Sequence, residues 1–347
     1  MNHEPTSEAG FTDPIFWPSD PPTKPLDKYF ESYSHYGIHE DMLKDKQRTR
    51  AFKNAILNNR YLFKDKTVLD IGCGTGILSF FAVKAGASHV YAIDNSSIIL
   101  SAMQIAELNR FSAITFIHGK VEEVSLPCST VDIIISDWMG YFLLYENMLE
   151  TIIYARNKWL VPGGMMFPDR ARLFLAGIED AKFKDEKFEF WNDVYGIDMS
   201  ILRGKSLQEA HIEEITSDAI LSTSFPVFEV DLLRIEAEEI EFVSQYEIQF
   251  TRNDFMHALM GWFEVSFTQC HVPVSFSTSP RVKETRWKQT IFYLENSQPV
   301  SVGQILRGSI AIRKNLVEPR GLDIKISFKM VNKQYPIDTA QYFSLTR

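Results

Sequence analysis

The chain has 347 residues, of which 45% are hydrophobic and 23% charged, as in a globular protein with a sizeable core. Its formal net charge of −9 argues against a duplex nucleic-acid binder and suits a cationic substrate, although solubility alone also accounts for it. No apolar stretch approaches the roughly 18 residues of a membrane span. The three cysteines are scattered and odd in number, so we expect no metal site and a reducing, cytoplasmic and/or nuclear location.

The first half of the chain alternates strand-like and helix-like patterns. Residues 1–25 are rich in Pro, Ser, Thr and acids and predict a flexible tail, whereas residues 27–56 predict a helix. A buried-strand pattern at 67–71 then leads into a glycine-rich turn. Further helices are predicted at 77–85 and 97–109, and further strands at 90–93, 114–117 and 131–136. This alternation predicts a doubly wound parallel sheet.

The pattern changes after the Pro-Gly-Gly of residues 162–164. Alternating strand-like runs follow, which predict an antiparallel β domain, either a barrel or a sandwich. Residues 180–205 are rich in Lys, Glu, Phe and Tyr and match neither the helical nor the strand periodicity of apolar residues, so they predict an insertion. We therefore assign a cofactor domain to residues 26–165 and a β domain to residues 166–347.

The glycine-rich turn predicts a cofactor site. Gly72 and Gly74 let the backbone approach a ligand closely, and the following helix offers its N-terminal N–H groups to a carboxylate. Asp94 ends the next strand, where an acid can accept both hydroxyls of a ribose. Asp70 precedes the turn, where it would repel a pyrophosphate but attract an ammonium. The third glycine of the turn, Gly76, comes one residue too early for the G-x-G-x-x-G pattern of dinucleotide-binding proteins. The sequence therefore favours S-adenosylmethionine over NAD.

Two acids lie on the loop after the strand at 131–136. Asp137 and Glu146 are nine residues apart, and aromatic residues lie between them. Parallel sheets bind ligands at the carboxyl ends of their strands. A guanidinium stays charged because its pKa exceeds about 12, and two carboxylates can clamp its planar donors. The loop predicts an arginine-binding site, with two solvated surface acids as the alternative.

Three segments, 70–76, 136–149 and 285–293, resemble the protein arginine methyltransferase family, most closely its predominant type I enzymes. The resemblance implies a Rossmann-like S-adenosylmethionine-binding domain and an antiparallel β-barrel domain with an inserted helical dimerisation arm at about 180–205. It implies methyl transfer to arginines of arginine-glycine-rich proteins, giving mono- and asymmetric dimethylarginine. It also implies a homodimer, or a hetero-oligomer with a paralogous methyltransferase. We expect no direct nucleic-acid or membrane partner.

The resemblance also implies roles for residues near the cofactor. An aromatic motif closes over the cofactor, an arginine pairs with its methionine carboxylate, and a glutamate accepts from the adenine amine. The matching residues here are Tyr33 of the aromatic motif, His39 and Arg48 near the methionine portion, and Val121 and Glu122 at the adenine.

Two positions depart from the family pattern. Asp137 replaces a glutamate and is one methylene shorter, and Arg286 replaces the histidine of a Thr-His-Trp motif. The family's histidine pairs with an acid that matches Asp45, and Arg286 is expected to keep that ion pair without relaying a proton. These departures raise an alternative, in which the chain is a weak or inactive paralogue acting as a regulatory subunit of an active arginine methyltransferase.

Overall fold

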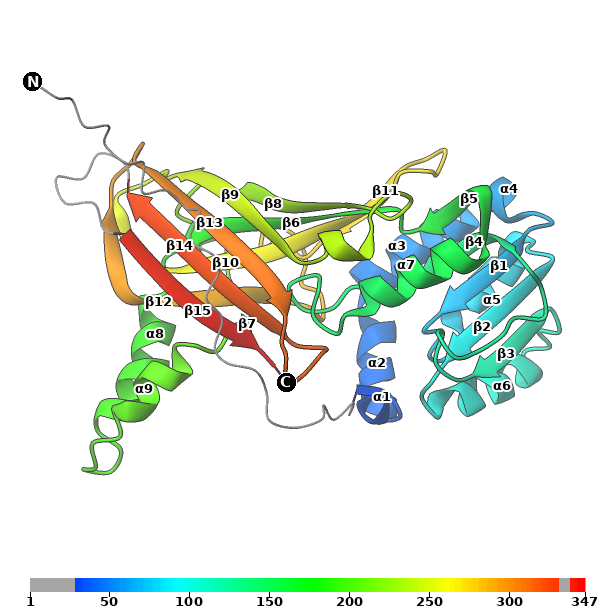
Figure 1. The fold of residues 1–347 in the computed structure, drawn as a ribbon, viewed down its shortest axis with the longest axis horizontal. Helices are drawn as coiled ribbons and strands as arrows, with labels where there is room; N and C mark the ends of the chain where they lie inside the picture. The colour runs from blue at the N-terminus through cyan, green and yellow to red at the C-terminus, as the bar shows by residue number, and fades with distance from the viewer. Residues whose placement is uncertain (1–28, 331–337, 347) are drawn as a thin grey trace, which may run out of the picture.

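The computed structural model describes residues 29–330 and 338–346, so the predicted tail at 1–25 lies outside the described residues. Figure 1 shows a parallel sheet with helices at one end of the molecule and a β-barrel at the other. The last parallel strand ends at Phe167 and the first barrel strand begins at Arg170.

The parallel sheet has the strand order β3-β2-β1-β4-β5. Its strands are β1 (Thr67–Ile71), β2 (His89–Asp94), β3 (Ile114–His118), β4 (Val131–Ser136) and β5 (Leu160–Phe167). Its helices are α5 (Ile77–Ala85), α6 (Ile98–Leu108) and α7 (Met148–Trp159). All four pairings are parallel, which confirms the predicted doubly wound arrangement. The strand order reverses beside β1 and β4, so a ligand site is expected at their carboxyl ends.

The helix predicted at 27–56 is wrong as a single element. It is divided into α1 (Tyr29–Ser32), α2 (Tyr36–Lys44) and α3 (Lys46–Leu57), and α4 (Arg60–Phe63) follows. Asp45 is extended at ψ 96°, and its side chain accepts the N–H of Arg48, so it caps α3. This cap competes with a continuous helix. Helix α3 packs against both α5 and the barrel strand β11 (Val274–Ser277).

The β domain consists of two antiparallel sheets. One has the order β7-β12-β10-β6-β8 with β11 beside β10, and the other has the order β15-β14-β13-β9. Their strands, besides β11, are β6 (Arg170–Ile178), β7 (His211–Glu213), β8 (Phe225–Asp231), β9 (Phe242–Gln249), β10 (Asp254–Phe267), β12 (Gln289–Val300), β13 (Ile305–Lys314), β14 (Leu322–Met330) and β15 (Asp338–Leu345). The two sheets curl around a shared apolar core, so the structure is the barrel rather than the sandwich.

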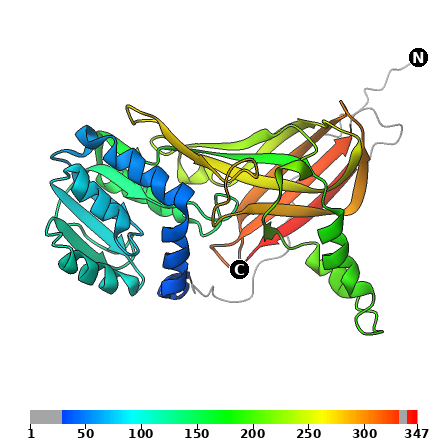
Figure 2. The same ribbon diagram turned by 180° about the vertical axis from the view of Figure 1, so that it is seen from behind.

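The predicted insertion forms a helical arm between β6 and β7. It contains α8 (Ala181–Phe188), the 3₁₀ helix η1 (Glu189–Asn192) and α9 (Ile201–Ser206), and it projects from the end of the barrel remote from the parallel sheet (Figures 1 and 2). Its aromatic residues divide into two groups. Phe188 is fully buried against Tyr293 at the base, whereas Phe190 is half exposed and Tyr195 is fully exposed. The base therefore belongs to the barrel core, and only the tip is free for association.

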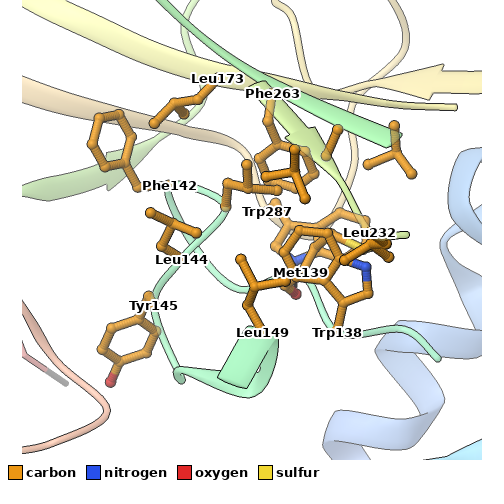
Figure 3. Packing of buried hydrophobic residues seen from close by; sticks show 14 of the residues in the cluster. Trp138, Met139, Phe142, Leu144, Tyr145, Leu149, Leu173, Leu232, Phe263 and Trp287 are labelled. Carbon is orange, nitrogen blue, oxygen red and sulfur yellow. Dashed lines mark hydrogen bonds between the residues drawn. The ribbon is translucent and has the colours of Figure 1, made fainter. Parts of the chain in front are cut away.

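The loop between β4 and α7 is locked into the barrel, as Figure 3 shows. Phe142 packs against Gly261 of β10, where a Cβ would lie 2.1 Å from its ring. Trp287 donates its indole N–H to the carbonyl of Met139 at 2.9 Å. At Gly140 a Cβ would lie 1.8 Å from the carbonyl oxygen of Tyr145, so only glycine fits. The barrel thus fixes the path of the loop that carries both predicted acids.

Candidate active site

A cavity of about 1080 Å³ opens at the carboxyl ends of β1, β2 and β4. Helices α1 and α2, the loop before α7 and the loop between β13 and β14 form its other walls. Ten of the residues predicted for the site line it: Tyr33, His39, Gly72, Gly74, Asp94, Val121, Glu122, Asp137, Glu146 and Arg286. Segments that are far apart in sequence therefore meet around one cavity.

The glycine-rich turn forms the floor of the cavity. Gly72 and Gly74 have left-handed backbones at φ 70° and 52°. The N–H of Gly74 donates to Asp94 Oδ2 at 2.8 Å, so Asp94 fixes the turn as well as facing the cavity. A Cβ at Gly74 would lie 3.2 Å from the ring of His39. A side chain at position 74 would therefore fill the space beside His39. Glycine leaves this space open, as a close-fitting cofactor requires.

Other predicted cofactor residues line the same cavity as this turn. His39 is buried, and its Nε2 lies 2.8 Å from the carbonyl oxygen of Tyr33. Val121 is buried in the cavity wall, and Glu122 beside it accepts the hydroxyl of Thr151 at 2.7 Å. Glu122, the acid predicted for the adenine, therefore lies in the wall of this cavity.

Asp70 does not line the cavity, which corrects its predicted contact with the cofactor ammonium. It is fully buried under α5, where Ser79 donates to its Oδ2 at 2.6 Å. Successive side chains of a strand point to opposite faces, and this one points toward the helix. Burial raises the pKa of Asp70 to about 7, and its other oxygen accepts no hydrogen bond from the described residues.

Arg48, predicted to pair with the cofactor carboxylate, pairs in this structure with Asp137. Its Nε donates to Asp137 Oδ2 at 2.6 Å, and both side chains are almost completely buried. It does not line the cavity, whereas Asp137 does. Asp137 Oδ1 is buried and accepts no hydrogen bond from the described residues. One oxygen of Asp137 is therefore held in place and the other is available to a ligand.

Glu146 faces the same cavity from a strained position. Its backbone has φ 78°, which is uncommon for a residue other than glycine. The hydroxyl of Tyr33 donates to both carboxylate oxygens, at 3.1 and 3.0 Å. Burial raises the pKa of Glu146, and the nearby Asp137 adds to the effect, while Arg286 opposes it. Tyr33 thus orients the second acid, a contact that the sequence did not suggest.

The predicted ion pair between Arg286 and Asp45 is wrong. Asp45 Oδ2 accepts the backbone N–H of Arg286 at 2.9 Å, and its Oδ1 caps α3 by accepting the N–H of Arg48. The guanidinium instead lines the cavity with both acids, and its Cζ lies 5.0 Å from the ring centroid of Trp287. Burial opposes the charge, but Tyr33, Asp137 and Glu146 outweigh it and raise the pKa of Arg286. A resident cation therefore lies beside the two acids.

Arg320 also lines the cavity, beside Phe30 of the predicted aromatic motif, and it was not among the predicted site residues. Arg320 contacts the backbone of Glu146, although the two are separated by 174 positions. No local pattern predicts a contact across such a distance, so the sequence carried no signal for it.

Two family models match the chain. One, described as a methyltransferase domain, covers residues 68–164, and the other, the arginine methyltransferase oligomerization subdomain, covers residues 169–333. The chain is 52% identical over 320 residues to protein arginine N-methyltransferase 1 of Chlamydomonas reinhardtii, spanning 92% of this chain and 93% of that protein. It is 50% identical over 303 residues to the protein of the same name from Schizosaccharomyces pombe, spanning 87% and 89%. The chain belongs to the protein arginine N-methyltransferase family.

Solved structures agree with this assignment. The Trypanosoma brucei PRMT1 enzyme-prozyme heterotetrameric complex with AdoHcy matches with a TM-score of 0.88 and 39% identity over 91% of this chain and 100% of that one. Arabidopsis thaliana protein arginine methyltransferase 10 matches with a TM-score of 0.84 and 30% identity over 92% and 100%. This arginine methyltransferase therefore uses S-adenosylmethionine, and the predicted fold, activity and cofactor are confirmed.

Within residues 29–330 and 338–346 of this methyltransferase, no three His, Cys, Asp or Glu side chains gather as metal ligands would. No helix of the described part combines the length and apolar character needed to cross a bilayer.

The turn at Gly74 provides a direct test of cofactor binding. We expect Gly74→Arg to abolish binding of S-adenosylmethionine, because a long side chain at this left-handed position would fill the cavity beside His39. Calorimetry measures the affinity, and Gly204→Arg, with open space around its Cα on the arm, is the matched control. Retention of wild-type affinity by Gly74→Arg would show that the cofactor binds elsewhere.

Proposed function

We propose that this methyltransferase holds the guanidinium of a substrate arginine between Asp137 and Glu146. The observation that carries the proposal is that both acids face the cavity floored by the glycine-rich turn, and that Asp137 Oδ1 is buried without a donor. Arg48 fixes Asp137 and Tyr33 fixes Glu146, so both acids are positioned before the substrate arrives.

The acids act by orienting the guanidinium and redistributing its charge. Hydrogen bonds from its planar donors to two carboxylates fix its orientation. Charge drawn toward Glu146 leaves more lone-pair density on the nitrogen that attacks. S-adenosylmethionine supplies, when bound, an electrophilic methyl group on its sulfonium. Methylation releases one proton from the guanidinium, and Glu146 is placed to accept it because burial raises its pKa.

The cofactor contacts are divided among separate elements. Gly72 and Gly74 admit the methionine portion close to the backbone, with His39 beside the turn. Asp94 is positioned for the ribose hydroxyls. Val121 and Glu122 lie where the adenine would bind, at the end of the cavity beside α7. These assignments follow from the lining of the cavity and the family pattern together.

The substrate class follows from charge. The net charge of −9 and the acids of the cavity favour arginine-glycine-rich proteins as substrates. The resemblance to type I enzymes implies mono- and asymmetric dimethylarginine as the products. Direct binding to nucleic acid is disfavoured by the same charge. The site of action is the cytoplasm and/or the nucleus, in keeping with three free cysteines.

Methyl transfer by the purified chain alone tests this function. The chain is incubated with S-adenosylmethionine carrying a labelled methyl group and an arginine-glycine-rich peptide, and the products are hydrolysed and identified. We expect labelled mono- and asymmetric dimethylarginine, and none with the matched peptide in which lysine replaces arginine. Activity that appears only when a paralogous methyltransferase is added would instead identify the chain as a regulatory subunit.

The tip of the arm tests association between chains. We expect Tyr195→Glu to convert an oligomer into monomers, because the oligomerization subdomain carries a fully exposed tyrosine at this tip. Phe188 must stay, since it belongs to the barrel core. Light scattering measures the mass, and Val243→Glu, an exposed site on β9, is the control. A variant at Tyr195 with the wild-type mass would place the interface elsewhere.

A further inference from the structure

Arg320 holds the backbone of Glu146 from both sides. The N–H of Glu146 donates to the carbonyl of Arg320 at 2.8 Å, and Arg320 Nη1 donates to the carbonyl of Glu146 at 2.7 Å. Glu146 and the next residue, Asn147, both have left-handed backbones, at φ 78° and 54°. Such a conformation persists in non-glycine residues only where the surroundings enforce it. Both hydrogen bonds constrain the backbone of Glu146, and the one from Nη1 depends on the side chain of Arg320.

The same side chain packs against the first helix. The guanidinium carbon of Arg320 lies 3.8 Å from the ring centroid of Tyr29 and 4.8 Å from that of Phe30. Both aromatic residues belong to α1, and both line the cavity. A planar guanidinium stacks on aromatic faces as an ammonium cannot. Arg320 therefore links the short helix over the cavity to the acid below it.

The loop that carries Arg320 is held by its own hydrogen bonds. It joins β13 to β14, and Asn315 Oδ1 accepts the N–H groups of Val317 and Glu318, both at 2.9 Å. Gly321 donates to the carbonyl of Glu318 at 2.7 Å. These hydrogen bonds hold the barrel loop in place, and with it the side chain of Arg320.

We propose that Arg320 is a positioning residue for methyl transfer, which fixes the backbone of Glu146 and seats α1 over the cavity. The proposal rests on the proposed role of Glu146. Tyr33 orients the carboxylate of Glu146, whereas Arg320 sets where its backbone lies, so the two contacts are complementary. The catalytic acid of the parallel-sheet domain thereby depends on a residue of the barrel.

Arg320→Ala should lower kcat by about 100-fold, because a displacement of roughly 1 Å at a reacting centre has this effect. It should weaken cofactor binding only about fivefold, through the lost stacking on α1. Arg320→Lys should restore little of kcat, since lysine keeps the charge but lacks the planar guanidinium that stacks on Tyr29 and Phe30 while donating to Glu146. Arg307→Ala is the matched control, since Arg307 lies on β13 of the same sheet and pairs with the exposed Glu247.

A double-mutant cycle separates this role from a general loss of stability. In the Glu146→Gln background, Arg320→Ala should cause less than a threefold further loss in kcat, because its effect acts through the missing carboxylate. An equal loss in both backgrounds, or full recovery by lysine, would overturn the proposal. If Glu146→Gln itself keeps the wild-type kcat, the proposed function fails instead, whatever Arg320→Ala does.

Discussion

Glu146→Gln is expected to lower kcat for methyl transfer by about 1,000-fold while leaving the affinity for S-adenosylmethionine nearly unchanged. The amide keeps the shape of the carboxylate and an oxygen for the hydroxyl of Tyr33. It loses the negative charge that orients the guanidinium and accepts its proton, and general base catalysis contributes about 10² to 10⁴ in rate. Steady-state rates with an arginine-glycine-rich peptide measure kcat, and Glu264→Gln on the outer face of β10 is the control.

The pH profile provides a second readout for this acid. Burial raises the pKa of Glu146, and only its carboxylate form can accept a proton. Activity should therefore be present above this raised pKa and lost as the pH falls through it, above the ordinary range of a glutamate. The Gln variant should lack this acid limb. A wild-type limb within the ordinary range, or the same limb in both proteins, would contradict the assignment.

The largest gain is expected from the double variant Asp137→Glu with Arg286→His. Arg286 places a permanent cation beside both acids, where it would compete with the guanidinium of the proposed substrate. Asp137 is already held by Arg48, so an added methylene extends its free oxygen into the cavity. The single-turnover rate at saturating cofactor should rise by about 30- to 1,000-fold, equivalent to roughly 2 to 4 kcal/mol of barrier.

The single variants and a charge-preserving control resolve the two effects. Each single change should raise the rate less than the double variant does. The rate increase of the double variant should exceed the product of the two single increases if both residues act on one bound guanidinium. Arg286→Lys keeps the cation and should give no gain. A double variant slower than wild type would show that Asp137 and Arg286 form a working site with its own geometry.

The sequence predicted the elements that local patterns determine. Buried strands alternating with helices gave the parallel sheet, and the glycines with Asp94 gave the floor of the cavity. The acids of the loop after β4 were predicted from their position at the carboxyl end of a strand. These features depend on spacing within about 20 residues, which periodicity can detect.

Contacts between distant segments were not predictable in the same way. Arg48 reaches Asp137 across 89 positions. Asp45 accepts the backbone N–H of Arg286, while the side chain of Arg286 lines the cavity. The break at Asp45 has a local cause instead, because its carboxylate caps α3 through the N–H of Arg48 and interrupts the helical pattern on both sides. Which of several acids an arginine joins is decided by the three-dimensional packing.

The interlocked loop between β4 and α7 has a consequence for recombining this enzyme with its relatives. In a hybrid joined between β5 and β6, the loop that carries Asp137 and Glu146 would come from one parent. The barrel surface that packs against this loop would come from the other. Phe142 against Gly261, and the indole of Trp287 on Met139, would then have to match by chance. Productive chimaeras should therefore transplant the loop at 137–147 together with the barrel that receives it, so the inherited unit is discontinuous in the chain.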